Sequence, residues 1–242
     1  MNLFKYIKQQ SPLLNIKKYL KYNHIVFLDN AASTQKPCSL LENQTIYYSK
    51  YNSNVNRGSY KLANKNSLLY NKSRLRISKL LNCRGSNNVV LLSGGTEAFN
   101  FVQNSFCSKF LKNNDNVILS ILEHHSNIIP WILLSIKLNI KLKFIGICTN
   151  GYLNFLHYIK TVDKHTKFIS LVHVSNLLGL INPIAKFSNI SSVLNIPFLI
   201  DGTQYIIHNR ANVLKYKCDF YIFSSHKVMS SFGVGVLYIN DK

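Results

Sequence analysis

The sequence predicts an α/β fold in which a mostly parallel β-sheet is flanked by helices on both faces. Seven short runs rich in Val, Ile, Phe and Tyr are the expected strands, at residues 89–93, 116–120, 141–147, 168–174, 197–201, 219–224 and 235–239. Longer stretches compatible with helices fall between them, at residues 66–81, 96–111, 128–138 and 184–194. Alternating strands and helices build βαβ units. Runs that are apolar throughout fit strands buried on both faces.

The composition predicts one large soluble domain. Of the 242 residues, 47% are hydrophobic, which is enough to build a sizeable core. We expect an N-terminal helical segment at residues 1–25 and the large domain at residues 26–242. The apolar run at residues 128–136 contains Pro130 and is shorter than the ~20 residues of a membrane-spanning helix. The N-terminus lacks the features of a secretory signal, which predicts a cytoplasmic protein, with an organelle stroma or matrix left open.

The net charge of +20 raises the question of nucleic-acid binding. Asn, Ile, Lys and Tyr have AT-rich codons and are abundant throughout, so codon bias alone accounts for this profile. No basic stripe with interleaved aromatic residues is present. Base readout usually relies on Arg, and only five of the 29 basic residues are arginines: Arg57, Arg74, Arg76, Arg84 and Arg210. We therefore expect a Lys-rich solvated surface and no specific nucleic-acid partner.

The cysteines and histidines predict neither disulfides nor a metal site. The five cysteines lie far apart without a C-x-x-C pair, which suits a reducing compartment. His124 and His125 are adjacent, so on a regular element their rings are expected to point in different directions. No structural metal is expected.

A glycine turn follows the first expected strand. Residues 93–97 read SGGTE and lead into an expected helix. The N-terminus of a helix offers backbone N–H groups and a favourable dipole to an anion such as phosphate, and Thr96 adds a hydroxyl. Many turns of this kind are Gly-rich, so the signal is weak alone. The absence of a Lys after the glycines excludes a P-loop.

Two further strand ends carry ionisable residues. Asp201 ends one apolar run and Lys227 follows another, in a chain with only nine acids. Taken singly, the Asp is a turn former and the Lys a snorkelling surface residue. Ligands of parallel sheets bind beyond the carboxyl ends of the strands, so Thr96, Asp201 and Lys227 are expected to converge. A phosphate site, a partner for a pyridinium nitrogen and a desolvated amine together predict pyridoxal 5'-phosphate (PLP).

Seven segments resemble the class V aminotransferase family, and specifically the Suf-type cysteine desulfurases. The sequence therefore resembles the large domain of a fold-type I PLP-dependent transferase. The segments occur in the family's order and spacing, and the Glu-His-His and Ser-x-His-Lys blocks are the specific ones. They read FLDNAASTQKP at 27–37, RG at 57–58, GTE at 95–97, EHHSNIIPW at 123–131, HVSNLLG at 173–179, DGTQ at 201–204 and CDFYIFSSHK at 218–227.

The resemblance implies roles for the residues around the cofactor ring. Lys227 would form the internal aldimine and move a proton between the substrate α-carbon and cofactor C4'. Asp201 would pair with the pyridinium nitrogen and Gln204 would hydrogen-bond the ring hydroxyl. His124 would stack on the ring and assist proton transfer. Asn176 would lie near the substrate and the ring hydroxyl. Without the resemblance, His124 is a satisfied polar residue and Asn176 a turn former.

The resemblance also implies a phosphate site and a substrate. Thr96, Ser224 and His226 would bind the phosphate, together with backbone N–H groups of Gly95 and Thr96. The reaction would convert L-cysteine, or a related amino acid, to L-alanine and pass sulfur on for iron–sulfur cluster assembly. Family members are typically homodimers, and a sulfur-acceptor protein of the Suf system is the implied partner.

Departures from the family pattern put turnover in doubt. The family's nucleophilic cysteine and carboxylate-binding arginine belong to a smaller C-terminal domain, and neither has a counterpart in this chain. Cys218 matches an ordinary position and is expected to be buried. Asn56 replaces a common His, and Gly95 replaces the usual Thr. Residues 230–231, two serines, replace a Gly-Pro pair, which is expected to loosen that turn.

Four interpretations stay open at this point. The first is a cysteine desulfurase that supplies only the large PLP domain, its remainder coming from another polypeptide or having been lost. The second is a non-catalytic PLP-binding or partner-docking protein. The third is another class V lyase or transaminase, and the fourth, ranked lowest, is a nucleic-acid-binding module.

Overall fold

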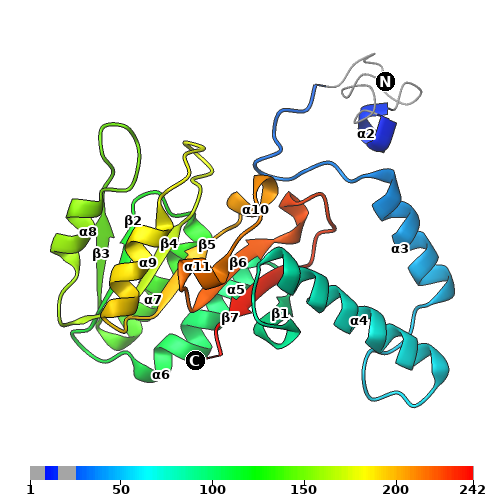
Figure 1. The fold of residues 1–242 in the computed structure, drawn as a ribbon, viewed down its shortest axis with the longest axis horizontal. Helices are drawn as coiled ribbons and strands as arrows, with labels where there is room; N and C mark the ends of the chain where they lie inside the picture. Colours follow the sequence, from blue (N-terminus) through cyan, green and yellow to red (C-terminus); the bar gives the residue numbers. More distant parts are fainter. Residues whose placement is uncertain (1–8, 16–25, 242) are drawn as a thin grey trace.

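A seven-stranded sheet forms the centre of the molecule (Figure 1). The computed structural model describes residues 9–15 and 26–241 of the chain. The strand order is β1-β7-β6-β5-β4-β2-β3. The pairs β2–β3, β2–β4, β4–β5 and β5–β6 are parallel, whereas β7 runs antiparallel to both β6 and β1. The predicted α/β fold with a mostly parallel sheet is confirmed.

All seven predicted strands form. β3 ends two residues before the predicted end, because the N–H of Gly146 donates to His157 Nδ1 (3.1 Å) instead of to a neighbouring strand. The bounds are β1 (Val89–Leu92), β2 (Asn116–Ser120), β3 (Lys141–Ile145), β4 (Thr166–Val172), β5 (Phe198–Asp201), β6 (Phe220–Ser224) and β7 (Gly235–Ile239).

Three of the four predicted helices form as single elements, namely α4 (Lys61–Leu80), α7 (Ile129–Leu138) and α9 (Ile184–Val193). The helix predicted at residues 96–111 is instead divided. α5 (Gly95–Phe101) passes into a π-helical turn, η2 (Val102–Cys107), and then into α6 (Ser108–Phe110). Phe106, in the π-helical turn, packs its ring against Phe110 and Phe220, with centroid distances of 4.9 and 5.1 Å.

α2 (Pro12–Asn15) lies within the N-terminal segment that was predicted to be helical. Several other elements were not predicted. They are α3 (Cys38–Lys50), α8 (Phe155–Thr161), α10 (Tyr205–His208), α11 (Val213–Tyr216) and the 3₁₀ turns η1 (Ser86–Asn88), η3 (His125–Asn127) and η4 (Ser225–Lys227). Two of them had a local signal in the sequence. Asn154 and Asn212 cap α8 and α11, each accepting from the backbone N–H three residues later at 2.9 Å, as N-cap residues do.

The sheet is covered on both faces, as predicted. Buried side chains fall into two clusters, and adjacent strand residues contribute to opposite ones: Ile118 packs with one cluster and Val117 with the other. The first cluster lies against α8, α9, α10 and α11, through residues such as Tyr158 and Phe187. The second lies against α5, η2 and α7, and includes Trp131. The sheet is thus rigidly held, which fixes the positions of its strand ends.

The helices α3 and α4 extend away from this body (Figure 1). None of the side chains of α3 is buried, and α4 buries only Ala63, Asn66 and Ser78. The predicted N-terminal helical segment, residues 1–25, falls mostly outside the described residues, so the predicted domain boundary stays a prediction. Among the residues placed by the structure, no helix has the length and apolar character needed to cross a membrane.

Candidate active site

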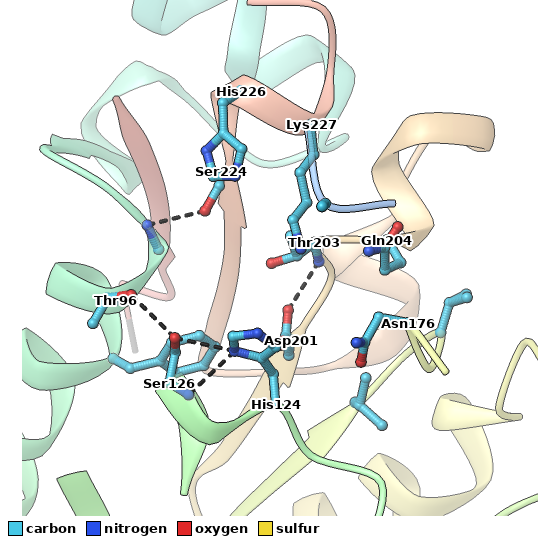
Figure 2. Close-up of a pocket in the computed structure, with 15 residues that line it drawn as sticks. Thr96, His124, Ser126, Asn176, Asp201, Thr203, Gln204, Ser224, His226 and Lys227 are labelled. Atoms are coloured by element: carbon cyan, nitrogen blue, oxygen red, sulfur yellow. Dashed lines mark hydrogen bonds between the residues drawn. The ribbon is translucent and has the colours of Figure 1, made fainter. Parts of the chain in front are cut away.

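A cavity of about 260 Å³ lies at the carboxyl ends of β4, β5 and β6 (Figure 2). Strand register places Asp201, the last residue of β5, between Val172 of β4 and Ile222 of β6. The sides of the cavity are closed by three segments, namely the start of α5, the turn around η3, and η4 itself. All nine residues predicted as site residues line the cavity. They are Gly95, Thr96, His124, Asn176, Asp201, Gln204, Ser224, His226 and Lys227, joined by Ala32, Phe99, Ser126, Val172, Val174 and Thr203.

Hydroxyl groups gather at one end of the cavity. The N–H of Gly95 donates to Ser224 Oγ at 3.1 Å, which joins the start of α5 to the end of β6. Thr96 Oγ1 lies 3.1 Å from Ser126 Oγ, and Figure 2 shows Thr96, Ser126 and Ser224 on the same side, below His226. Hydroxyls beside a helix N-terminus suit an anion.

Asp201 supplies a buried negative charge at the centre of the cavity. Its side chain is about 5% exposed, and Oδ1 accepts a hydrogen bond from the N–H of Thr203 at 2.9 Å. No residue described by the structure forms an ion pair with it. A buried carboxylate without a cationic partner is costly, so a protonated ring nitrogen placed here would provide the missing charge.

Lys227 reaches into the cavity from η4, at the end of the turn that follows β6 (Figure 2). Its ammonium is half-buried, and burial lowers the pKa of Lys227, while the charge of Asp201 acts in the opposite direction. A lowered pKa increases the fraction of free amine, which is the nucleophilic form. The structure thus places a half-buried lysine in the same cavity as Asp201.

His124 lies below Lys227 and beside Asp201 (Figure 2). Its Nδ1 accepts from the N–H of Ser126 at 3.2 Å, so the neutral ring carries its proton on Nε2. Burial lowers the pKa of His124, with the positive charges of His125 and Lys227 acting in the same direction and Asp201 opposing them. The ring is therefore neutral near pH 7.

The predicted divergence of the two adjacent histidine rings is wrong. The rings of His124 and His125 have centroids 4.0 Å apart and an interplanar angle of 33°. His124 has extended backbone angles and caps η3, so the pair spans the start of a turn and not a regular element. The alternation expected of a regular strand or helix does not apply there.

Gln204 and Asn176 lie at the other end of the cavity (Figure 2). Gln204 Nε2 donates to the carbonyl of Ala31 at 2.9 Å, which ties this end to the segment before α3. Asn176 is exposed on the loop after β4. It is therefore a solvent-accessible residue of the cavity lining.

Comparison with known proteins identifies the family. The family model for class-V aminotransferases matches residues 26–242. The chain belongs to the class-V aminotransferase family. It is 37% identical over 239 residues to a cysteine desulfurase of Wigglesworthia glossinidia brevipalpis, and the match covers 98% of this chain but 58% of that protein. The chain thus spans little more than half the length of this relative.

Solved structures agree with this assignment. The apo structure of a cysteine desulfurase from Thermococcus onnurineus NA1 superposes with a TM-score of 0.90 at 30% identity, covering all of this chain and 58% of that one. A cysteine desulfurase from Escherichia coli gives a TM-score of 0.86 at 26% identity over 98% of this chain and 57% of that one. The predicted fold, the large domain of this family, is confirmed.

Two departures from the family pattern acquire a structural account. A Cβ on Gly95 would lie 2.5 Å from Ser224 Oγ, so in this class-V aminotransferase the glycine provides the space that the serine hydroxyl occupies. We had expected the serine pair at 230–231 to loosen the turn, and it does not. Ser225 Oγ donates to the carbonyl of Ser231, and Gln44 Nε2 donates to Ser231 Oγ at 2.7 Å. Side-chain hydrogen bonds therefore hold the turn.

A buried network supports the family's Glu-His-His block. Glu123 accepts from Asn127 Nδ2 at 2.7 Å, from the N–H of Val172 at 2.8 Å and from Ser120 Oγ. It joins the ends of β2 and β4, next to His124 in the chain. Burial raises the pKa of Glu123 to about 8. Sequence reasoning did not single out Glu123, nor the cavity residues Ser126 and Thr203, although all three lie within the motifs quoted.

The cysteines of this family member lie away from the cavity. None of the five, and none of the arginines, is among the residues that line it. Cys218 is fully buried, as predicted. Cys107 is also buried, and burial raises the pKa of its thiol well above the ordinary value. Both are therefore poor nucleophiles.

Proposed function

We propose that this chain forms the PLP-binding part of a cysteine desulfurase. The observation that supports it best is the meeting of two residues in one cavity: the half-buried amine of Lys227, and Asp201, which is buried and has no ion-pair partner among the described residues. Relatives named cysteine desulfurase that align with nearly the whole chain support the choice of reaction. The proposed substrate is L-cysteine, the proposed products are L-alanine and transferable sulfur, and the proposed assembly is a homodimer.

The residues present fit PLP at both ends of the cavity. Thr96, Ser126, Ser224 and His226 would hold the phosphate, and Asp201 would keep the pyridine nitrogen protonated. Gln204 and Asn176 would hydrogen-bond the ring hydroxyl and face the substrate. When bound, PLP supplies an electron sink for bonds at the substrate α-carbon.

The ionisable side chains would then handle the protons. Lys227, with its lowered pKa, would hold the cofactor covalently and afterwards move a proton between the substrate α-carbon and cofactor C4'. Neutral His124 would lie against the ring and present Nε2–H toward the substrate. Val172, Val174 and Phe99 would exclude water from the buried side of the ring.

The step that accepts sulfur requires groups that do not line this cavity. A thiolate must attack the substrate sulfur, and a cation must bind the substrate carboxylate, yet neither a cysteine nor an arginine is present there. We propose that the thiolate and the cation come from polypeptide outside these 242 residues. A sulfur-acceptor protein of the Suf type is the proposed final recipient of the sulfur. The same observation favours a second candidate, a PLP-binding protein that does not turn over, and another class-V lyase or transaminase is the third.

The visible absorbance spectrum tests the cofactor assignment. Purified protein incubated with PLP should gain a visible band, and borohydride should fix the cofactor to Lys227. Lys227→Ala should abolish both, whereas Lys167→Ala, which removes an exposed lysine, should not. Failure of the wild-type protein to take up PLP would overturn the proposal.

Product analysis then separates the candidates. With L-cysteine, a reductant and a polypeptide that supplies the missing cysteine and arginine, a desulfurase releases sulfide and alanine in equal amounts. Cofactor uptake without either product would favour the non-catalytic protein, and a spectral response to amino acids without sulfide would favour a lyase or transaminase.

A further inference from the structure

The turn that carries Lys227 is held by a segment about 190 residues earlier in the chain. We call residues 225–233 the lysine loop and residues 29–37 the overlying segment. Three donors of the overlying segment converge on the carbonyl oxygen of His226, directly before Lys227. They are the N–H of Thr34 at 3.2 Å, Thr34 Oγ1 at 2.9 Å and Lys36 Nζ at 3.0 Å. The peptide group between His226 and Lys227 is thus fixed from outside the lysine loop.

Thr34 also holds the far side of the turn. Its hydroxyl oxygen accepts from the N–H of Met229 at 2.8 Å, and the residue is only about 6% exposed. Met229 has a positive φ of 58°, a conformation that costs a non-glycine residue energy and persists where surrounding contacts impose it. One hydroxyl therefore bridges the residues on both sides of Lys227.

Lys36 contributes a charge that is directed at the same loop. Its ammonium lies 4.8 Å from the centroid of the Phe232 ring, and that ring stacks on His226 with centroids 5.4 Å apart. Lys36 forms no ion pair with any acid in the described part of the chain. Neither Lys36 nor Thr34 lines the cavity, so neither is placed to contact a cofactor there.

We propose that Thr34 and Lys36 are positioning residues that orient the peptide group of Lys227 so that its amine faces the cofactor. The inference rests on the proposed function. Without these donors, the phosphate-side residues Ser224 and His226 stay in place, but the lysine loop loses the restraint on the peptide that directs the lysine. The residues act on covalent attachment of PLP more than on its binding.

Two conservative variants test the proposal in the full chain. Thr34→Val removes the hydroxyl and keeps the shape, and Lys36→Met keeps the stem over Phe232. The matched controls are Thr45→Val and Lys167→Met, whose side chains donate to the carbonyls of Leu41 and Lys164 at 3.0 Å, away from the site.

The first measurement separates binding from attachment. Total PLP content is measured after denaturation, and the fraction fixed to Lys227 by a brief borohydride pulse is measured by mass spectrometry. In both variants we expect near-normal PLP content at saturation. Covalent attachment to Lys227 should be slowed roughly two- to tenfold, because the loss of one hydrogen bond changes an equilibrium or a rate by about that factor. Thr34→Ser should restore the rate. Equal attachment rates in wild type and both variants, or a parallel loss of content and attachment, would overturn the proposal.

The second measurement needs no cofactor. In the apo protein, hydrogen exchange of the Met229 amide should accelerate roughly two- to tenfold in Thr34→Val and stay unchanged in Thr45→Val. A wild-type protein that takes up no PLP overturns the proposed function. In that case faster exchange at Met229 still supports the restraint of the lysine loop, and unchanged exchange overturns it.

Discussion

The buried carboxyl of Glu123 predicts a specific dependence of stability on pH. Its pKa is raised from an ordinary 4.5 to about 8, first by burial and also by the charge of Asp201. Between these two pH values the folded state holds a proton that the unfolded state has released. The free energy of unfolding therefore falls as pH rises through this window. At about 1.36 kcal/mol per pH unit, the titration of Glu123 lowers the free energy of unfolding by at most roughly 5 kcal/mol across this window.

Glu123→Gln tests this reasoning because an amide does not titrate. The amide of a glutamine also does not fit the hydrogen-bond network around residue 123. The carboxyl faces two N–H donors, Asn127 Nδ2 on one oxygen and Val172 N on the other. Either orientation of the amide places its NH₂ against one of them, and Asn127 cannot turn because its Oδ1 accepts from Trp131 and Ser170. We expect a cost of about 1–3 kcal/mol at pH 5, where the wild-type carboxyl is protonated.

The assay is urea unfolding of the apo protein from pH 5 to pH 9. Trp131 is the single tryptophan and belongs to this network, so its fluorescence reports unfolding. The wild type should be the more stable protein at pH 5, and its advantage should shrink and reverse by pH 9. Glu97→Gln is the control, since its exposed carboxylate has a pKa lowered by the N–H of Ser93 and titrates below the window. A difference between wild type and Glu123→Gln that is constant with pH would refute the reasoning.

Two further changes have expected outcomes. Gly95→Ala should displace the Ser224 hydroxyl, because the new Cβ would lie 2.5 Å from Oγ. An equilibrium titration should then show PLP binding weakened roughly two- to tenfold. The control is Gly85→Ala, where a Cβ meets nothing within 4 Å, and it should leave PLP binding unchanged. His173 stacks on Tyr205 with centroids 3.6 Å apart, and burial lowers its pKa to about 3. The contribution of neutral His173 to stability is present above pH 6.5 and is lost as pH falls toward 3. In urea unfolding, the stability of His173→Phe should therefore fall less steeply with acid than that of the wild type. An unchanged acid dependence would contradict the lowered pKa of His173.

The central strands were predictable because both of their faces are buried. A run such as Phe220–Ser224 has no polar face, so its apolar composition alone marks it. α3 was not predictable in the same way, since it buries none of its side chains and so needs no apolar stripe. The π-helical turn within residues 96–111 was missed. It contains Phe106, whose ring packs on that of Phe220, and such a contact between residues distant in the sequence leaves no local pattern.

The centre of the site was predictable from the position of charged residues at strand ends. Asp201 and Lys227 stand out because the first ends an apolar run and the second follows one closely, in a chain with few acids. Parallel strands bring such ends together without further information. Ser126 and Thr203 carry no such mark. Ser126 acts through a hydroxyl between Thr96 and His124, and Thr203 acts through its backbone N–H, which every residue but proline possesses.

Gly95 illustrates why a departure from a family pattern has no fixed meaning in the sequence alone. From the residue type, the loss of the usual threonine was one of the departures that put turnover in doubt. In the structure a Cβ on residue 95 would lie 2.5 Å from the Ser224 hydroxyl, to which the Gly95 N–H donates. A side chain at residue 95 would therefore crowd the Ser224 hydroxyl as the two residues lie here. If so, Gly95→Thr should not strengthen PLP binding, because the new side chain and Ser224 compete for the same space, and tighter binding by that variant would contradict this account.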